Sequence, residues 1–134
     1  MGRSGYSESC EGWDLIRWRG AVASAIRGHR GQALLQEMAD TLDAMEVREL
    51  VAGELESDGQ HCALGSVGLR RGIQLAELDP YDREGIAKAF GIAGALVAEI
   101  AFVNDGEYSY RHESPAERWQ RVRAWVDNQI RKEA

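Results

Sequence analysis

Three features of the 134-residue sequence predict a mainly α fold, a compact bundle of five or six helices. Apolar residues recur three and four positions apart over most of the chain, which is the period of an amphipathic helix. Residues that begin and end helices lie between these segments. The composition, with 44% hydrophobic and 28% charged residues, is that of a globular chain able to form one core. We therefore expect a single helical domain.

The beginning of the chain differs from the rest. It reads MGRSGYSES, which is polar and rich in Ser and Gly, so we expect a flexible arm over residues 1–11 and the domain over residues 12–134. The arm lacks the apolar stretch of a signal peptide, and the apolar run at 90–103 is too short to cross a bilayer. Cys10 and Cys62 form no disulfide framework. These observations predict a cytoplasmic protein that does not bind a membrane.

Two helices are predicted in the first third of the chain, over residues 11–27 and 32–45. Gly28 and Gly31 lie between them and suit the end of a helix. Each helix carries one apolar stripe that we expect to be buried. The stripes consist of Leu15, Trp18, Val22, Ala25 and Ile26, with Ile16 at the side, and of Leu34, Leu35, Met38, Leu42 and Met45.

Residues 46–64 allow two interpretations. The apolar positions 47, 50, 51 and 55 have helical spacing, which favours a helix followed by a turn. The alternative is one short β-hairpin, because Asp58-Gly59 is typical of a two-residue hairpin turn.

A short helix is predicted over residues 63–71, with glycines at positions 65, 68 and 72. Glycine destabilises a helix by roughly 0.5–1 kcal/mol relative to alanine, so three on one side need a structural reason. We expect this bare face to pack against a second face of small residues, formed by Gly91, Gly94, Ala95 and Ala98.

The segment 86–105 has the pattern of a helix-turn-helix. We predict an N-cap at Asp79, a tight turn at Phe90-Gly91-Ile92 and a longer helix over 93–103. Two core helices joined by a turn is the favoured interpretation. A DNA-binding regulator that uses residues 83–102 is an alternative, but the second helix offers Glu99 and no donor to a base edge.

The last helix has the clearest start in the chain. Ser114 suits the N-cap, Pro115 the first helical position, and Glu117 completes a capping box. Its predicted buried face comprises Trp119, Val122, Trp125, Val126 and Ile130, and its exposed basic face Arg118, Arg121, Arg123, Arg131 and Lys132.

Charge is unevenly distributed along the chain. The net charge of −6 disfavours general binding to nucleic acid. Eight acids and one base lie between residues 37 and 58, and four arginines and no acid lie between residues 17 and 30. Such stretches are most often solvated faces, but they also suit contact with a protein of opposite charge. The candidate partner-binding residues are Glu37, Asp40, Asp43, Glu46 and Glu49, together with Arg17, Arg27 and Arg30.

Cys62 is the one candidate nucleophile. It precedes a predicted helix, whose dipole lowers a thiol pKa, and a hydrolase or transferase would pair it with His61 or His112 and with Asn104. A small buried residue is the commoner interpretation. Three scattered histidines and two distant cysteines make no zinc spacing, so we expect neither a metal nor a cofactor. The small-residue faces and four tryptophans would suit a homodimer.

Four segments carry a resemblance to known sequences: GWDLIRWRGAVASAIRGHRGQALLQEM, CALGSVG, EIAFVND and SPAERWQRVRAWV. Together they resemble a family of small proteins encoded by tailed bacteriophages and prophages of Gram-negative bacteria, a family with no established activity. The resemblance spans residues 12–126. The Cys-x-x-Gly segment followed by Asn-Asp is also similar to a wider set of bacterial domains. The matching residues are Cys62, Gly65, Asn104 and Asp105, which either serve the function or fix the fold.

The resemblance implies a context rather than a reaction. Small non-enzymatic phage proteins act on host machines, and inhibitors of host defence such as anti-CRISPR proteins are one such class. We therefore expect a non-catalytic protein that binds a protein partner inside a bacterial host cell, with a host defence complex as the favoured target.

Overall fold

Six α-helices and one short β-hairpin form the regular structure of the part of the chain that the computed structural model describes, residues 2–6, 13–106 and 112–131. The predicted mainly α fold is confirmed. The elements are α1 (Trp13–Arg27), α2 (His29–Asp43), β1 (Glu56–Ser57), β2 (Gln60–His61), α3 (Ala63–Arg71), a 3-10 turn η1 (Leu75–Glu77), α4 (Arg83–Phe90), α5 (Gly94–Asp105) and α6 (Pro115–Gln129).

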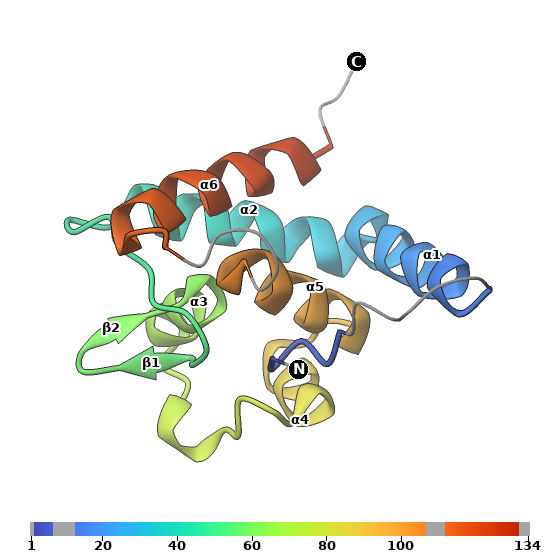
Figure 1. The fold of residues 1–134 in the computed structure, drawn as a ribbon, viewed down its shortest axis with the longest axis horizontal. Helices are drawn as coiled ribbons and strands as arrows, with labels where there is room; N and C mark the ends of the chain where they lie inside the picture. The colour runs from blue at the N-terminus through green and yellow to red at the C-terminus, as the bar shows by residue number, and fades with distance from the viewer. Residues whose placement is uncertain (1, 7–12, 107–111, 132–134) are drawn as a thin grey trace.

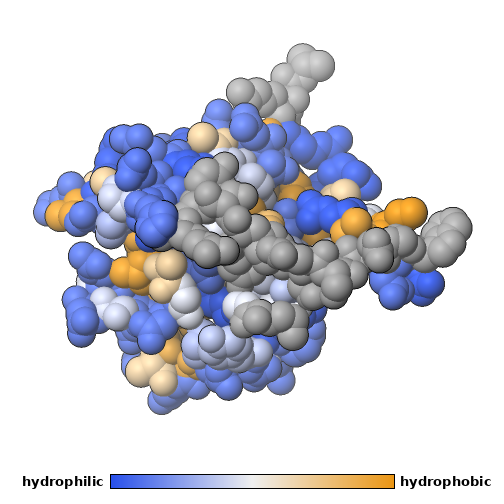
Figure 2. All heavy atoms as spheres, viewed as in Figure 1, coloured by the Kyte–Doolittle hydropathy of each residue, from blue (hydrophilic) through white to orange (hydrophobic). Residues whose placement is uncertain are grey.

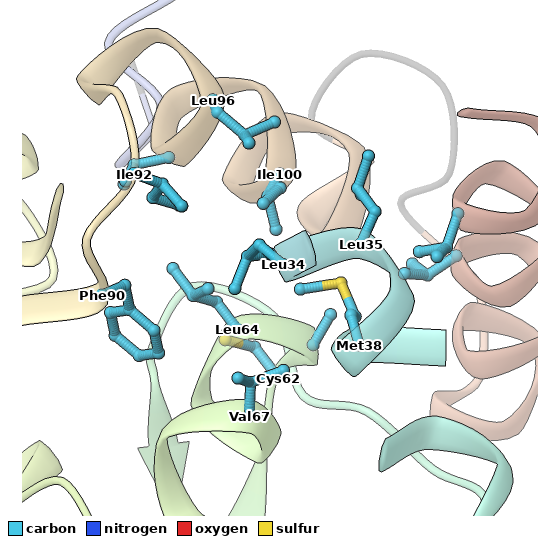
Figure 3. Close-up of a cluster of buried hydrophobic side chains, with 14 of the residues drawn as sticks. Leu34, Leu35, Met38, Cys62, Leu64, Val67, Phe90, Ile92, Leu96 and Ile100 are labelled. Atoms are coloured by element: carbon cyan, nitrogen blue, oxygen red, sulfur yellow. The ribbon is translucent and has the colours of Figure 1, made fainter. Parts of the chain in front are cut away.

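Two helices, α2 and α5, form the centre of the molecule. α2 contacts α1, α3 and α6, and α5 contacts α1, α3, α4 and α6 (Figure 1). Figure 3 shows the side chains of α2 directed between α5 on one side and α3 on the other. The side chains at this junction are almost fully buried, among them Leu34, Leu35, Met38, Leu96 and Ile100. The core therefore joins segments that are more than sixty residues apart in sequence.

The predicted helix-turn-helix pair is present as α4 and α5, whose axes differ in direction by 104°. Gly91 ends α4 with φ 71°, and the N–H groups of Gly91 and Ile92 both donate to the carbonyl of Ala87. A left-handed residue suits glycine because no Cβ clashes there. The predicted N-cap at Asp79 is wrong: Asp82 caps α4 by accepting from Gly85 N–H at 3.1 Å.

The hairpin alternative for residues 46–64 is correct, and the favoured helix is not formed. Asp58 and Gly59 have φ of 51° and 79°, which is the left-handed pair that a tight hairpin turn requires. The preceding segment makes backbone hydrogen bonds to other elements. Leu50 N–H donates to Pro115 O at 3.1 Å, and Val51 N–H donates to His61 O at 3.0 Å. These tertiary bonds outweigh the local helical spacing.

The glycine face of α3 has a different neighbour from the one predicted. A Cβ added to Gly65 would lie 1.9 Å from the carbonyl oxygen of Leu55, so this glycine lets the segment before the hairpin approach the helix. A Cβ on Gly68 would lie 2.7 Å from Leu75 Cδ2 and 2.9 Å from Phe90 Cζ. The expected contact with the small residues of α5 is therefore wrong.

Several side chains differ from their predicted burial. Leu15 and Ile16 of α1 are exposed, and Arg118, predicted on the outside of α6, is buried. Residues 2–6 lie against α5 with Arg3 and Ser4 buried, which differs from the loosely held arm expected there. The described residues exclude residues 1 and 7–11 of the predicted arm, and with them Cys10. They also exclude Lys132.

A pair of glycine-to-alanine changes tests this packing. Gly65→Ala places a methyl group against the backbone of Leu55 and should lower the free energy of unfolding by at least ~1–3 kcal/mol. Gly20→Ala, on α1, meets nothing within 4 Å and should raise it by roughly 0.5–1 kcal/mol. Urea denaturation of both variants gives the two values, and a stable Gly65→Ala protein would contradict the close approach.

Candidate functional site

The residues Cys62, Gly65, Asn104 and Asp105, singled out from the sequence, lie together in the structure. Cys62 and Gly65 belong to the start of α3, and Asn104 and Asp105 to the last turn of α5. The backbone N–H of Ala63 donates to Asn104 Oδ1 at 3.0 Å, which joins the two helix ends directly. This junction is the candidate site.

Cys62 is the N-cap of α3, and its side chain is 1% exposed. Its sulfur accepts hydrogen bonds from Gly65 N–H at 3.3 Å and from Arg3 Nη1 at 3.6 Å. Ser66 Oγ donates to the Cys62 carbonyl at 2.8 Å. The thiol thus takes the place that Ser or Asp usually occupies at a helix start.

The histidines proposed as partners of Cys62 are engaged or placed elsewhere. His61 Nε2 lies 3.5 Å from Glu56 Oε2 across the hairpin, and His112 is exposed before α6. Among the described residues, the hydrogen bonds to the sulfur come from Arg3 and Gly65 and not from a histidine. No histidine of the part of the chain that the structure describes thus bonds to the sulfur, as the base of a cysteine hydrolase would.

Asn104 is fully buried and links three segments. Its Nδ2 donates to Val51 O at 2.8 Å and to Asp105 Oδ1 at 3.0 Å, while its Oδ1 accepts from Ala63. Asn104 and Asp105 thus hold the segment before the hairpin and the start of α3.

Asp105 makes the most contacts at the site. Arg3 Nε and Nη2 each donate to one of its carboxylate oxygens at 2.8 Å, and Gly53 N–H donates to Oδ1 at 3.0 Å. Burial alone would raise the pKa of Asp105, but the Arg3 guanidinium and the bonds from Gly53 and Asn104 outweigh it and lower the pKa. The pair is a buried, bidentate ion pair, the strong form of this interaction.

Arg3 is the site residue that sequence reasoning missed. It lies 102 positions from Asp105 in a segment without hydrophobic pattern. Its side chain is only 4% exposed. No local signal predicts such a contact, because the arginine becomes buried only when the whole bundle has formed.

A second buried carboxylate, Glu99, lies one and a half turns before Asp105 on α5. Tyr6 Oη donates to it at 2.8 Å, and Arg19 Nη1 and Nη2 donate to it at 2.9 and 3.0 Å. The Tyr6 ring meets Trp18 edge-on at 5.6 Å between centroids. Burial and the Glu99 carboxylate raise the pKa of Tyr6, although Trp18 and Arg19 oppose the shift. Residues 2–6 are thus held at both ends.

The acidic candidate residues fall into two groups. Glu37 and Asp43 are paired with arginines of the same chain at the surface, because Arg71 Nε lies 2.9 Å from Glu37 Oε2 and Arg123 Nε lies 2.8 Å from Asp43 Oδ1. Hydrogen bonds from these arginines lower the pKa of both carboxyls. The second group, Asp40, Glu46 and Glu49, makes no ion pair with any described residue.

The basic candidate residues Arg17, Arg27 and Arg30 are exposed, as predicted. Arg30 Nη1 also reaches Gly91 O at 3.4 Å. Of the predicted basic face of α6, Arg118 is buried, whereas Arg121 and Arg123 are half-buried and engaged in ion pairs. Arg118 and Arg121 pair with Glu113 at 3.4 and 2.7 Å, and Arg123 pairs with Asp43. Arginine in this helix therefore holds the fold together more than it charges the surface.

The predicted reading helix of the helix-turn-helix, α5, is the core helix of the molecule. Seven of its twelve residues are buried, from Leu96 to Asn104. A helix covered in this way cannot enter the major groove of DNA, which takes an exposed helix. The favoured interpretation, two core helices joined by a tight turn, agrees with this packing.

Neither a metal site nor a membrane-spanning helix is found among the described residues. Over residues 2–6, 13–106 and 112–131, no three His, Cys, Asp or Glu side chains are grouped so that they would hold a metal ion. No single helix of the described residues has the length and apolar composition to span a membrane. Only α4 and α5 taken together have that length and composition, and this pair is bent. No protein-family model, curated protein or solved structure matches the chain. The phage-type resemblance therefore stays a prediction.

Changing Asp105 tests the ion pair through its pH dependence. Because the folded pKa is depressed, the pair stabilises the fold above the unfolded pKa of about 4 and is lost as pH falls through the lower folded pKa. Asp105→Asn should cost on the order of 3 kcal/mol at pH 7 and flatten the loss of stability on acidification. Urea denaturation from neutral pH to about pH 3 measures both effects.

The exposed Asp58 supplies the control for this experiment, although its positive φ suits Asn as well as Asp. Asp58→Asn should leave both the stability at pH 7 and the acid dependence close to those of the unaltered chain. An Asp105→Asn protein with an unchanged acid dependence would show that Asp105 is not ionised against Arg3.

Proposed function

We propose that this protein acts without catalysis, by binding a basic surface of another protein through an acidic end formed by Asp40, Glu46 and Glu49. The observation that carries the proposal is the unequal neutralisation of the acidic stretch. Glu37 and Asp43 are paired with arginines, whereas these three carboxylates make no ion pair with any described residue. Unpaired charges of one sign give long-range attraction to a partner of opposite charge.

The position of these carboxylates supports contact with a partner. Asp40 lies on the last turn of α2, and Glu46 and Glu49 lie on the segment that directly follows it. The bond from Leu50 N–H to Pro115 O holds that segment beside the start of α6, where Glu117 is exposed. Figure 2 shows a mainly hydrophilic face over these elements.

Two arginines near the acidic end, Arg48 and Arg123, make their printed contacts with other groups. Arg48 stacks over the ring of Trp119 at 4.6 Å and donates to Asp43 O at 3.1 Å, so it is directed toward α2 and α6. Arg123 is engaged by Asp43 and lies near Asp127. Arg48 and Arg123 are thus engaged by groups other than Glu46 and Glu49, although the charge of Arg123 also acts on Asp40.

The burial of the Cys62 thiol also supports a binding role. The Cys62 sulfur is buried and accepts two hydrogen bonds, which leaves a substrate no approach to it in this conformation. The phage-type resemblance supports the choice of partner class, a host defence complex of a bacterial cell. Such complexes hold nucleic acid in basic grooves, and an acidic protein surface matches such a groove.

Charge reversal tests the proposal with a matched control. The tagged chain is used to recover partners from a nuclease-treated bacterial lysate, with identification by mass spectrometry. The triple variant Asp40→Lys, Glu46→Lys, Glu49→Lys should lose the partner, and affinity for the purified partner should fall by about tenfold or more. The same affinity should weaken as salt rises from about 0.05 to 0.3 M.

The control makes the same change in net charge on other surfaces. Asp14, Glu77 and Glu84 are exposed on α1, the 3-10 turn and α4, and their reversal to Lys should leave binding intact. Equal loss of binding in both triple variants would show a general charge effect. A partner that binds both variants as well as the unaltered chain would overturn the assignment of the acidic end.

A further inference from the structure

The segment of residues 2–6 crosses α5 and is held by side chains at its two ends (Figure 1). At one end the Arg3 guanidinium uses Nε and Nη2 on the two oxygens of Asp105 and Nη1 on the sulfur of Cys62. At the other end Tyr6 reaches Glu99 and packs on Trp18 and Phe102. We name residues 2–6 the strap.

The groups that receive Arg3 are positioned by other parts of the chain. Gly53 N–H and Asn104 Nδ2 both donate to Asp105 Oδ1 at 3.0 Å, and Gly65 N–H donates to the Cys62 sulfur. None of these donors belongs to the strap. Donors outside the strap therefore hold both acceptor groups in place, and the carboxylate presents its two oxygens to the guanidinium fork.

The strap itself has little structure of its own. It contains no helix or strand, and its Gly5 N–H donates back to Gly2 O within the segment. A small cavity lies beside Arg3 and is lined by apolar side chains that include Leu55, Leu64 and Ile100. Segments attached through a few side chains open more easily than the helices of a core.

We propose that Asp105 and Cys62 form a guanidinium-binding pocket that Arg3 fills from within the same chain, and that the strap is displaceable and covers the Cys62 thiol. Release of the strap opens the pocket to another planar cation of the guanidinium class and makes the thiol accessible. This inference does not depend on the acidic end or on the partner proposed for it.

The first test uses the full chain with Cys10→Ser, so that Cys62 is the only thiol. Its reaction with the aromatic disulfide DTNB is followed over a series of urea concentrations below the unfolding transition. A displaceable strap predicts labelling that is faster than global unfolding allows and nearly independent of urea at low urea. Labelling that follows global unfolding, with its full urea dependence at every concentration, would overturn the proposal.

The second test removes the guanidinium and then returns it. In the same Cys10→Ser chain, Arg3→Ala should raise the labelling rate by about tenfold or more, whereas Arg27→Ala, on the exposed side of α1, should not change it. Millimolar ethylguanidinium should slow labelling of the Arg3→Ala protein to a saturable limit, and ethylammonium should do so much less.

Asp105→Asn added to Arg3→Ala should abolish this protection, because the carboxylate is gone. An Arg3→Ala protein that labels at the unaltered rate, or that ethylguanidinium does not protect, would overturn the pocket assignment. If Arg3→Ala does not fold, Arg3→Lys gives the same comparison, since it keeps the charge and loses the planar fork. Labelling of Arg3→Lys no faster than that of the parent chain would then count against the pocket.

Discussion

Two adjacent side chains at the end of α5, Asn104 and Asp105, hold together four segments that are remote in sequence. Asn104 bonds to the carbonyl of Val51 and to the N–H of Ala63, and Asp105 bonds to the N–H of Gly53 and to the guanidinium of Arg3. In a dry interior each such group costs free energy if it is left without a partner. Satisfying all of them at once requires the segment before the hairpin, the start of α3 and the strap to take one arrangement. A buried and fully bonded network of this kind specifies a unique packing more than it adds raw stability.

This junction explains why the region before α3 is irregular. Residues 46–55 have the apolar spacing of a helix, but their polar backbone groups are used by partners elsewhere, at Pro115, His61 and Asn104. A helix would satisfy those groups locally and would deprive Asn104 of the Val51 carbonyl and Asp105 of the Gly53 N–H. Gly65 belongs to the same solution, because only a residue without Cβ lets the Leu55 carbonyl approach α3 so closely. Residues 46–55 thus form no helix, and their backbone groups bond instead to polar groups of the core.

Ion pairs within the chain also decide which charges the surface presents. Arginines 71, 118, 121 and 123 each pair with a carboxylate from another part of the fold or from the preceding turn. The charges that stay unpaired differ from those that a count along the chain indicates. Three arginines of α6 make ion pairs, and of the five acidic candidate residues only Asp40, Glu46 and Glu49 make none with a described residue. A contact surface defined by sequence alone would have included Glu37 and Asp43, whose reversal would disturb the fold as well as any partner. Separating the two groups is what makes the charge-reversal experiment interpretable.

Most helices of this protein can be predicted from residues close together in sequence. The contacts between these helices cannot be predicted in that way. The helices α2, α3 and α6, the turn at Gly91 and the capping box at Ser114 are legible in the sequence, because each depends on residues within about one or two helical turns. The sequence also singled out Cys62, Gly65, Asn104 and Asp105, yet it contained no sign of the arginine that meets them. Arg3, the hairpin and the inward arginines of α6 were decided by the tertiary structure, since burial and ion pairing depend on which distant groups the completed core brings within reach. Sequence alone thus determined the helices outside residues 46–64, and only the tertiary structure decided the form of that segment, which polar groups the helices bury and which charges stay free.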